Sequence, residues 1–301
     1  MKSRHSLIRM LCIAALATAS FVARSEVSGS TLERISARGS IFLGYDETSV
    51  PFSFAVSGSD EPMGMGVDIC HRVVKAIEEK LGKKLLVQPV PLSSNTPTMM
   101  VKTGMADIGC GAHTNTVGRA QQVAFSTTFF VSEVRAMVPV ESAGKSLKDM
   151  DGKRVVTTVG EPADRLIKQA ALSRGVSIRT LLGRNPAQSM SMLVAGNADA
   201  YVTEYASLLA SRAESAKPEK YAILDESYSV EPYALILPKD DAQFKQLVDD
   251  VVLGLMKSGE MERLYDTWFM KPIPPGNRNL NFPISPLNKA AYANPNDRPV
   301  N

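Results

Sequence analysis

The stretch Ser40-Ile41-Phe42-Leu43-Gly44-Tyr45 is a short apolar run bounded by polar segments, as expected of a buried strand. Apolar side chains then recur at helical spacing through 67–81, and Gly82 marks the end of that helix. An apolar run at 85–90, a short helical segment at 97–103 and a second apolar run at 106–110 follow in this order. Strand, helix and strand in this order predict βαβ units with parallel strand pairing.

The same pattern restarts after residue 152, so the chain contains two similar α/β segments, roughly 40–131 and 152–236. The second segment has expected strands at 154–158, 176–181 and 198–202, and expected helices at 162–173 and 187–194. Further helices are expected at 247–256 and 261–268, and the Pro- and Asn-rich tail from Pro272 is expected to be coil. Two α/β lobes suggest a ligand cleft between them, beyond the carboxyl ends of the strands.

The first 25 residues have the composition of a secretory signal. Lys2, Arg4 and Arg9 precede an apolar run from Met10 to Ala19, and small residues follow. The run is too short to span a bilayer, so we expect cleavage after Ala19 or Ser25 and a soluble mature protein, with an uncleaved anchor as the alternative. The segment holds four bases and no acid, so the formal charge changes from +3 to about −1 on its removal. This balance offers no electrostatic basis for nucleic-acid binding.

Two cysteines, Cys70 and Cys110, remain after removal of the signal. An oxidising compartment would allow them to pair, and the alternative is two small buried thiols. Their separation and the lack of suitable His neighbours argue against zinc, and we expect neither a metal nor a cofactor.

A polar segment, Thr114-Asn115-Thr116-Val117-Gly118-Arg119, directly follows the strand that ends at Cys110. Hydroxyl and backbone N–H groups at the end of a strand can face an anion. The guanidinium of Arg119 can hold a carboxylate through two parallel hydrogen bonds. The alternative is a solvated base on a helix surface.

Several motifs resemble the family 3 extracellular solute-binding proteins, the polar amino-acid receptors of ABC importers. The resemblance runs from about Ser30 to Asn301 and is greatest to glutamate/aspartate-binding proteins. The motifs of the family are 44–54, Gly64-Met65-Gly66-Val67-Asp68-Ile69, Gly104-Met105-Ala106-Asp107-Ile108, Arg119 with Phe125-Ser126, and Gly196-Asn197-Ala198-Asp199-Ala200. Those of the subgroup are 237–241, 257–260, 268–275, Asn281-Phe282 and 294–297.

The resemblance implies a role for several side chains at the head of an amino acid. Arg119, helped by Thr114, would hold the α-carboxylate, while Glu204 and the backbone around Ala112 would receive the α-ammonium. The alternative role of Glu204 is that of an acidic residue at a helix N-terminus, where the helix dipole favours a negative charge. Phe52 would cover the alkyl stem of the ligand, with packing in the core as its alternative.

The chain departs from the glutamate/aspartate pattern where the ligand side chain would lie. Asp46 stands in the position of an Arg, Pro97 near that of a second Arg, Ala112 in that of a Ser and Pro186 in that of a His. A buried Asp46 would repel an acidic side chain, so a neutral polar or cationic ligand is expected, unless Asp46 faces solvent or pairs with a base of the protein. His113 and Glu161 are expected to line the same pocket.

The resemblance therefore predicts a type II periplasmic binding protein fold with three parts. These are a signal peptide (1–25), a first lobe (26–131 plus 235–301) and a second lobe (132–234). It implies a periplasmic monomer that passes an amino acid to an inner-membrane ABC permease and catalyses no reaction. Two alternatives share the fold: a cyclohexadienyl-dehydratase-like enzyme, with Glu161 or Glu204 as acid, and an accessory partner of a periplasmic dehydrogenase.

Overall fold

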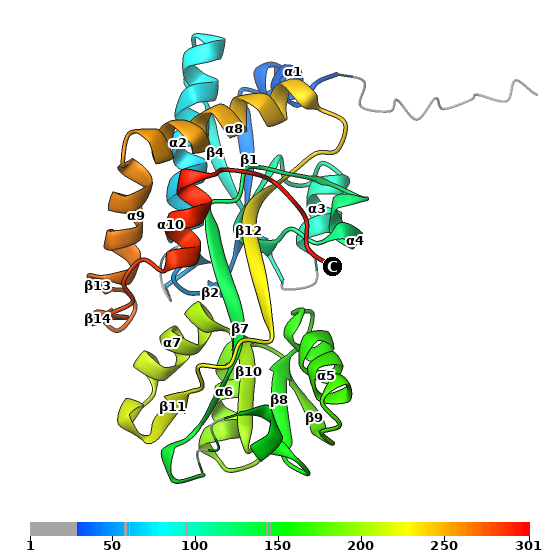
Figure 1. Cartoon of the computed structure of the whole chain (residues 1–301). Helices are drawn as coiled ribbons and strands as arrows, with labels where there is room; N and C mark the ends of the chain where they lie inside the picture. Colours follow the sequence, from blue (N-terminus) through cyan, green and yellow to red (C-terminus); the bar gives the residue numbers. More distant parts are fainter. Residues whose placement is uncertain (1–28, 57–58, 60, 94–95, 143, 145) are drawn as a thin grey trace, which may run out of the picture.

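The computed structural model describes residues 29–301 except 57–58, 60, 94–95, 143 and 145, so the expected signal segment lies outside the described residues. Two lobes are stacked one above the other, and two long strands run between them (Figure 1). No helix in the described part of the chain has the length and apolar character needed to cross a bilayer.

The first lobe contains the predicted strand–helix–strand unit. Strand β1 pairs in parallel with β4 on one side and β5 on the other. The apolar face of α2 is buried against this sheet, and the helix ends at Gly82, which has a left-handed backbone. The elements of this unit are α1 (Thr31–Arg38), β1 (Ser40–Asp46), β2 (Thr48–Ser49), β3 (Ser53–Phe54), α2 (Met65–Leu81), β4 (Leu86–Leu92), α3 (Pro97–Lys102), β5 (Ile108–Thr114), α4 (Val117–Ala120) and β6 (Ala124–Phe125).

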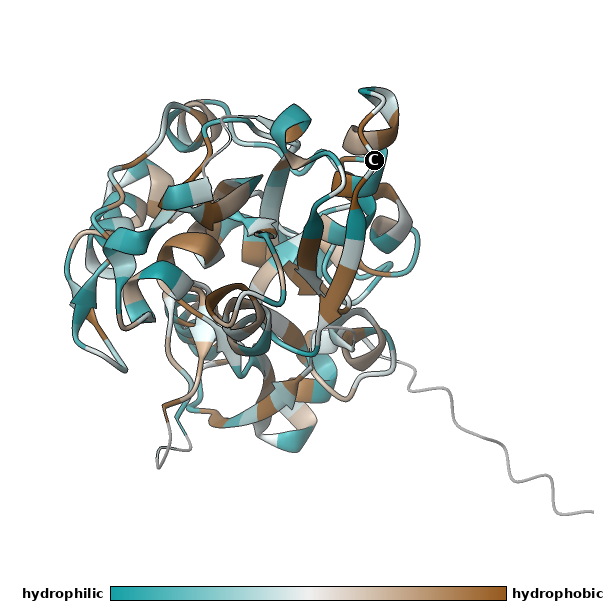
Figure 2. Cartoon of the chain, turned by 90° about the horizontal axis from the view of Figure 1, so that it is seen from below, coloured by the Kyte–Doolittle hydropathy of each residue, from teal (hydrophilic) through white to brown (hydrophobic). Residues whose placement is uncertain are grey.

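The second lobe repeats the arrangement, because β8 pairs in parallel with β9 and with β10. Separate apolar clusters cover the two faces of its sheet. Its elements are β8 (Arg154–Thr158), α5 (Ala163–Ser173), β9 (Arg179–Gly183), α6 (Pro186–Val194), β10 (Ala200–Glu204), α7 (Tyr205–Glu214) and β11 (Tyr221–Ile223), with short 3-10 turns at Val140–Ser142, Leu147–Met150 and Pro218–Lys220. Viewed from this end, hydrophobic stretches lie within the strands and helices, and hydrophilic stretches dominate the outer loops (Figure 2).

Strands β7 (Phe130–Pro139) and β12 (Ser229–Leu237) join the two halves into one sheet. They are antiparallel, with Ser229 opposite Val134 and Tyr233 opposite Phe130. The sheet order is β4-β1-β5-β12-β7-β10-β8-β9, with β6 against β12 and β11 against β7. The predicted lobe boundaries, at 131/132 and 234/235, fall within these two strands.

The remaining elements return to the first lobe, where α8 and α9 pack beside α2. The prediction of coil for the whole tail from Pro272 is wrong. Residues 286–293 form a helix that packs on β7. Ser285 caps this helix, Pro286 is its first residue, and the buried Asn288 exchanges two hydrogen bonds with the backbone of Val131. The elements are α8 (Ala242–Lys257), α9 (Glu260–Phe269), β13 (Pro272–Ile273), β14 (Arg278–Asn279) and α10 (Pro286–Ala293).

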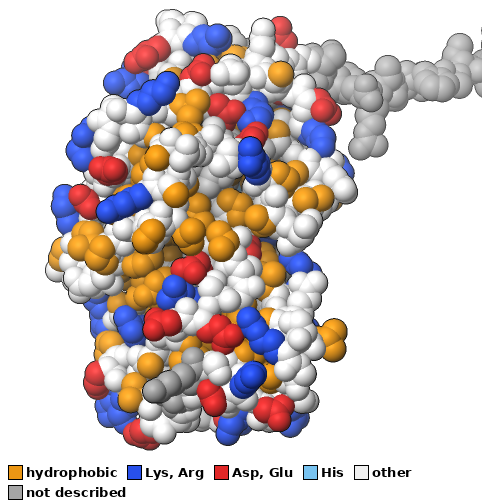
Figure 3. Space-filling model, viewed as in Figure 1, with side chains coloured by type: hydrophobic (Ala, Val, Ile, Leu, Met, Phe, Trp, Pro, Cys, Tyr) orange, Lys and Arg blue, Asp and Glu red, His pale blue; other side chains and the backbone are white. Residues whose placement is uncertain are grey.

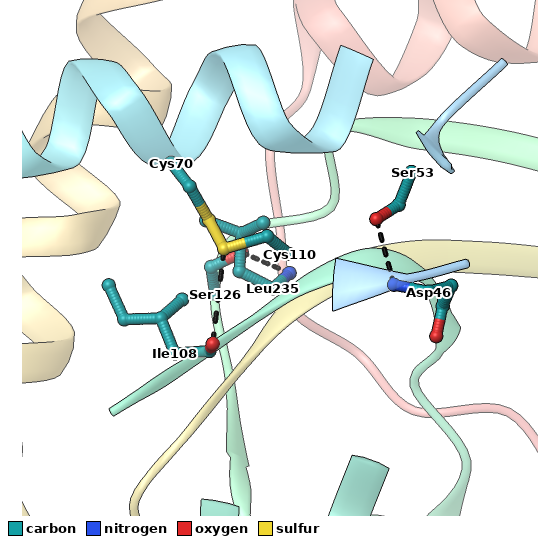
Figure 4. Close-up of a disulfide and its surroundings, with 7 residues drawn as sticks. All are labelled: Asp46, Ser53, Cys70, Ile108, Cys110, Ser126 and Leu235. Carbon is teal, nitrogen blue, oxygen red and sulfur yellow. Dashed lines mark hydrogen bonds between the residues drawn. A yellow bond between two sulfur atoms is a disulfide. The ribbon is translucent and has the colours of Figure 1, made fainter. Parts of the chain in front are cut away.

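A disulfide joins Cys70 on α2 to Cys110 on β5, with their Cα atoms 6.1 Å apart (Figure 4). The sequence left open whether these cysteines pair. The bond lies next to an irregularity in the β5–β12 ladder, where the backbone of Leu235 bonds instead to Ser126. The strand that ends at the polar segment is thereby tied to the main helix of its lobe.

The two lobes touch beside this sheet. The ring of Tyr205 on α7 lies 4.9 Å from that of Phe282, and Ala206 and Ala210 are buried in the core of the first lobe. Arg278 donates hydrogen bonds to the carbonyl oxygens of Ala213 and Ser215. Figure 3 shows hydrophobic side chains gathered where the lobes meet, on the side of α7 and the β13–β14 hairpin.

Candidate ligand-binding site

A small polar pocket of about 50 Å³ lies between the lobes, at the carboxyl ends of β1, β5 and β10. Seven of the eight side chains expected at a site line it: Asp46, Ala112, His113, Thr114, Arg119, Glu161 and Glu204. They come from both lobes, because the first five belong to β1, β5 and α4, and the last two follow β8 and end β10. Folding thus brings together residues up to 158 positions apart.

Phe52 is not among the residues that line this pocket. Its ring is buried in an aromatic cluster of the first lobe, 4.8 Å from Phe130, 5.2 Å from Tyr233 and 5.6 Å from Phe269. The structure therefore shows the packing alternative for Phe52, and we leave it out of the proposed site.

Arg119 is held at the pocket by the short helix α4. The Thr116 hydroxyl accepts from the backbone N–H of Arg119, and the guanidinium donates to the Thr114 carbonyl over 3.2 Å. No ion pair within 4.0 Å links Arg119 to a carboxylate in the described parts of the chain. Burial lowers the pKa of Arg119 below its ordinary value, with Glu204 and then Asp46 opposing the shift, yet a guanidinium stays charged. Its remaining donors are available for a ligand.

The C-terminal tail runs along the loop that positions Arg119. The backbone of Val300 accepts from the Val117 N–H and donates to the Asn115 carbonyl, both over 2.9 Å. The Asn115 side chain donates to the carbonyl of Asp297 over 2.8 Å. Arg165, on α5 of the other lobe, donates to the Asn301 carbonyl over 3.1 Å. The tail therefore holds the arginine loop and also touches the second lobe.

Asp46 ends β1 and is 8% exposed, so it does not face solvent. Its backbone N–H donates to the Ser53 hydroxyl over 2.9 Å (Figure 4). Burial raises the pKa of Asp46 to about 7, while the Ser49 hydroxyl, the Arg119 charge and the Ala112 N–H oppose that rise. No Lys or Arg lies within 4.0 Å of it among the described residues, so its carboxyl group remains open to a cation from outside.

His113 lies beside Asp46, with Nδ1 4.0 Å from Asp46 Oδ2. Burial and then the Arg119 charge lower the pKa of His113 to about 3, so the imidazole is neutral at physiological pH. Its Nε2 has no hydrogen-bond partner in the described structure. A neutral imidazole cannot balance a carboxylate in the pocket.

Glu161 and Glu204 approach each other through the Thr203 hydroxyl, which lies 2.7 Å from Glu161 Oε2 and 2.6 Å from Glu204 Oε2. The hydroxyl has one proton, so it can donate to only one of them, and the other contact needs a proton on a carboxyl group. Burial and then the nearby Glu204 raise the pKa of Glu161 to about 8. The two short contacts and the raised pKa both favour a proton on Glu161.

Sequence reasoning missed several lining residues: Ser49, Gly160, Pro162, Ser207 and Tyr233. Ser207 lies three positions after Glu204 on α7, a spacing that places both on one face of the helix. A further carboxyl group, Glu231 on β12, is 2% exposed and accepts a hydrogen bond from the Ser229 hydroxyl. Burial raises its pKa, and the nearby Glu204 adds to the rise. Glu231 is not among the residues that line the pocket.

The pocket has three carboxyl groups and one guanidinium among its lining residues. In the described residues, no group of three or more His, Cys, Asp or Glu side chains could hold a metal ion. Arg119 can receive a carboxylate, and the acidic side chains opposite can receive one or more cationic groups.

Two α/β lobes, joined by two long strands and enclosing a charged pocket, define a two-lobed binding protein. The chain belongs to the bacterial extracellular solute-binding proteins, family 3, whose model matches residues 41–271. It is therefore a solute-binding protein and not an enzyme, as expected from its sequence.

Named relatives and solved structures extend this assignment. The chain is 34% identical to the glutamate/aspartate import solute-binding protein of Escherichia coli K12, over 96% of this chain and 97% of the relative. It is also 34% identical to the L-glutamate/L-aspartate-binding protein of Pseudomonas aeruginosa, over 99% of this chain and 98% of that relative. An ancestral arginine-binding protein, solved with glutamine and with arginine, is 26% identical with a TM-score of 0.66. That comparison covers 77% of this chain and 98–99% of the solved ones.

Proposed function

We propose that the chain is the amino-acid-binding component of an ABC importer, and that its pocket takes a polar amino acid with a neutral or cationic side chain. It would work in the periplasm as a monomer after removal of residues 1–25, and would pass its ligand to an inner-membrane permease. Its family and the names of its relatives support amino-acid import. The structures of the ancestral arginine-binding protein show that a related fold accepts both glutamine and arginine.

In this proposal the head of the amino acid lies between Arg119 and Glu204. The guanidinium has donors to spare and would hold the α-carboxylate, beside the wall that Thr114 forms. Glu204, 7% exposed at the end of β10, would receive the α-ammonium from the opposite lobe. A ligand bound in this way joins the lobes and favours a closed form, since closure follows from contacts that are better in that form.

The observation that carries the choice of side chain is the buried carboxyl of Asp46. With Glu161 and Glu204 it gives the pocket two more acidic groups than basic ones. A ligand with an acidic side chain would bring a further negative charge into this space, and among the described lining residues only Arg119 is a base, which the α-carboxylate would already occupy. A cationic side chain could instead ionise Asp46 or Glu161, and a neutral amide could bond to either group in its protonated form.

This choice separates the chain from the relatives named for glutamate and aspartate, which are only 34% identical to it. At 34% identity the fold and the contacts to the amino-acid head group can be retained while the few side chains that select the ligand differ. Pro97, which lines the pocket, and Ala112 add no charge to offset Asp46.

A screen of all twenty amino acids by thermal shift and titration calorimetry at pH 7 tests the proposal. We expect stabilisation by glutamine, asparagine, arginine, lysine or histidine, and much weaker stabilisation by glutamate and aspartate. A ligand at a hundredfold excess over its Kd adds about 2.7 kcal/mol to the unfolding free energy, which is readily measured. Preferential binding of glutamate would overturn the role of Asp46, and no response to any amino acid would overturn the proposed function.

Two variants at one position sharpen the test. Asp46→Asn keeps the size and removes the acid, so affinity for a cationic ligand should fall while the head-group contacts remain. Asp46→Arg adds the charge that an acidic side chain needs, so glutamate should gain affinity relative to glutamine. If both variants keep the wild-type order of ligands, Asp46 does not select the side chain.

A further inference from the structure

A second and larger cavity, of about 410 Å³, lies between the lobes beside the pocket. One wall is the β2–β3 region of the first lobe, and the other consists of the facing sides of α6 and α7. Pro275, in the turn between β13 and β14, also lines the cavity. The cavity therefore lies between the lobes on the side of α7 and the β13–β14 hairpin, where Figure 3 shows hydrophobic side chains gathered.

The two spaces adjoin. Ser207 lines both of them. From the end of β1 to the residue after β2, Asp46 and Ser49 line the pocket, while Glu47, Thr48 and Val50 line the cavity. Along α7, Glu204 and Ser207 lie at the pocket, and Ala210, Ser211 and Glu214 continue along the cavity, at the three- and four-residue spacing of one helix face. Ser207 is therefore the position at which a molecule held at its head in the pocket would enter the cavity.

The lining of the cavity is largely apolar, with hydroxyl groups along α7 and α6. Its apolar residues are Val50, Phe54, Ala55, Pro186, Ala187, Met190, Val194, Ala210, Ala216 and Pro275. Its charged residues are two acids, Glu47 and Glu214, and no base lines it in the described structure. Arg278 is near Glu214, but its guanidinium donates to the carbonyls of Ala213 and Ser215 and does not line the cavity.

We propose that this cavity is a subsite for the distal part of an elongated ligand: an α-amino acid with a long, largely apolar side chain that ends in a cation. The apolar walls would cover the chain, and Glu47 or Glu214 would receive the terminal charge. This inference rests on the proposed function, because the head of the ligand occupies the pocket of Arg119 and Glu204.

The required length follows from the helix. Seven residues separate Ser207 from Glu214, and a rise of about 1.5 Å per residue places them about 10 Å apart along α7. A lysine side chain of about 6 Å, at roughly 1.25 Å per bond, is too short to reach from Ser207 to Glu214. Lysine extended at its side-chain amino group by a 6-aminohexanoyl group reaches Glu214 and ends in an ammonium.

Titration calorimetry with three probes tests the subsite: lysine, Nε-hexanoyl-lysine and Nε-(6-aminohexanoyl)-lysine. We expect the aminohexanoyl probe to bind at least tenfold tighter than lysine, and the hexanoyl probe to fall between them. The double variant Glu47→Gln and Glu214→Gln should remove the advantage of the aminohexanoyl probe over the hexanoyl probe. It should leave lysine affinity unchanged, since neither residue lines the pocket.

Filling the cavity gives a second, independent readout. Ser211→Trp on α7 and Val194→Trp on α6 each place a large side chain in it from different helices, and Val194 is 55% exposed in the structure. Both variants should lower the affinity for the two long probes more than tenfold, with little effect on the affinity for lysine. Ser173→Trp, at an exposed position of α5 outside the cavity, is the matched control.

The outcomes separate this inference from the proposed function. If both long probes bind more weakly than lysine to the wild type, or if the tryptophan variants weaken all three probes equally, the subsite is refuted and the amino-acid site stands. If neither these probes nor any of the twenty amino acids bind, the proposed function fails, and the subsite fails with it.

Discussion

The carboxyl group of Asp46 lies so close to Gly111 that a β-carbon added at Gly111 would come within 2.0 Å of Asp46 Oδ2. The same β-carbon would lie 2.8 Å from the His113 ring. Glycine in β5 thus leaves the space into which the strand β1 turns its last side chain. A buried acid beside the backbone of a neighbouring strand is possible here because that strand has no side chain at this point.

Gly111→Ala should therefore displace Asp46 and His113 together. We expect the unfolding free energy to fall by about 1–3 kcal/mol, as for other overpacked sites, and ligand affinity to fall with it. Urea unfolding and titration calorimetry measure the two effects. Gly254→Ala on α8, where a β-carbon meets nothing within 4 Å, is the control and should gain about 0.5–1 kcal/mol. Wild-type affinity in Gly111→Ala would show that the site does not depend on this packing.

Ligand-free stability should depend on pH through the two raised acids. Burial raises the pKa of Asp46 to about 7 and that of Glu161 to about 8, above their ordinary values of 3.8 and 4.5. The folded state then binds more protons than the unfolded state between about pH 4 and 8, so these groups lower the stability as pH rises through that window. The double variant Asp46→Asn and Glu161→Gln should flatten this dependence in urea titrations from pH 5 to 8.5. An unchanged slope would contradict the assignment.

Binding of a cationic ligand should release protons. A nearby ammonium or guanidinium favours the ionised carboxyl group, so it lowers the raised pKa values and its affinity increases with pH up to about 8. Calorimetry at pH 6 in two buffers of different ionisation enthalpy counts the protons. Release of up to one proton per titrating carboxyl is expected, and net uptake would indicate an anionic ligand group instead.

Arg119→Ala should lose about 2–5 kcal/mol of binding free energy, as for the removal of one partner from a buried charge pair. Arg119→Lys should recover only part of it, because an ammonium cannot form the two parallel bonds of a guanidinium. Arg184→Ala, at an exposed arginine of the second lobe that bonds to Gln188, should bind as the wild type does. Unaltered affinity in Arg119→Ala would place the ligand elsewhere.

The disulfide should contribute to the stability of the first lobe. It closes a loop with a sequence separation of 40 residues, so Cys70→Ser with Cys110→Ser should lower the unfolding free energy by about 2–4 kcal/mol. Reducing agent should have the same effect on the wild type and none on the double variant. A wild type insensitive to reduction under unfolding conditions would show that the bond does not form in solution.

Much of the architecture could be predicted from local pattern. The strands at 40–46, 86–92 and 154–158 and the helices at 65–81 and 163–173 lie within a few residues of their predicted bounds, because apolar spacing and glycine stops are local signals. The helix at 286–293 was missed, because it is short and its burial depends on Asn288 meeting a strand more than 150 residues earlier. The Pro- and Asn-rich composition of the tail favours coil locally and carries no information about that long-range contact.

Local patterns and the order of motifs were enough to predict the two α/β halves, the family and seven of the residues that line the pocket, because these features depend on periodicity and on short motifs that follow one another in the chain. Four features became visible only in the folded chain: Phe52 packs in the core, Cys70 meets Cys110, Asp46 is buried with no lysine or arginine within 4.0 Å among the described residues, and a second cavity adjoins the pocket. Burial, charge balance and cavity shape arise from contacts between segments distant in the chain, and no local pattern specifies them.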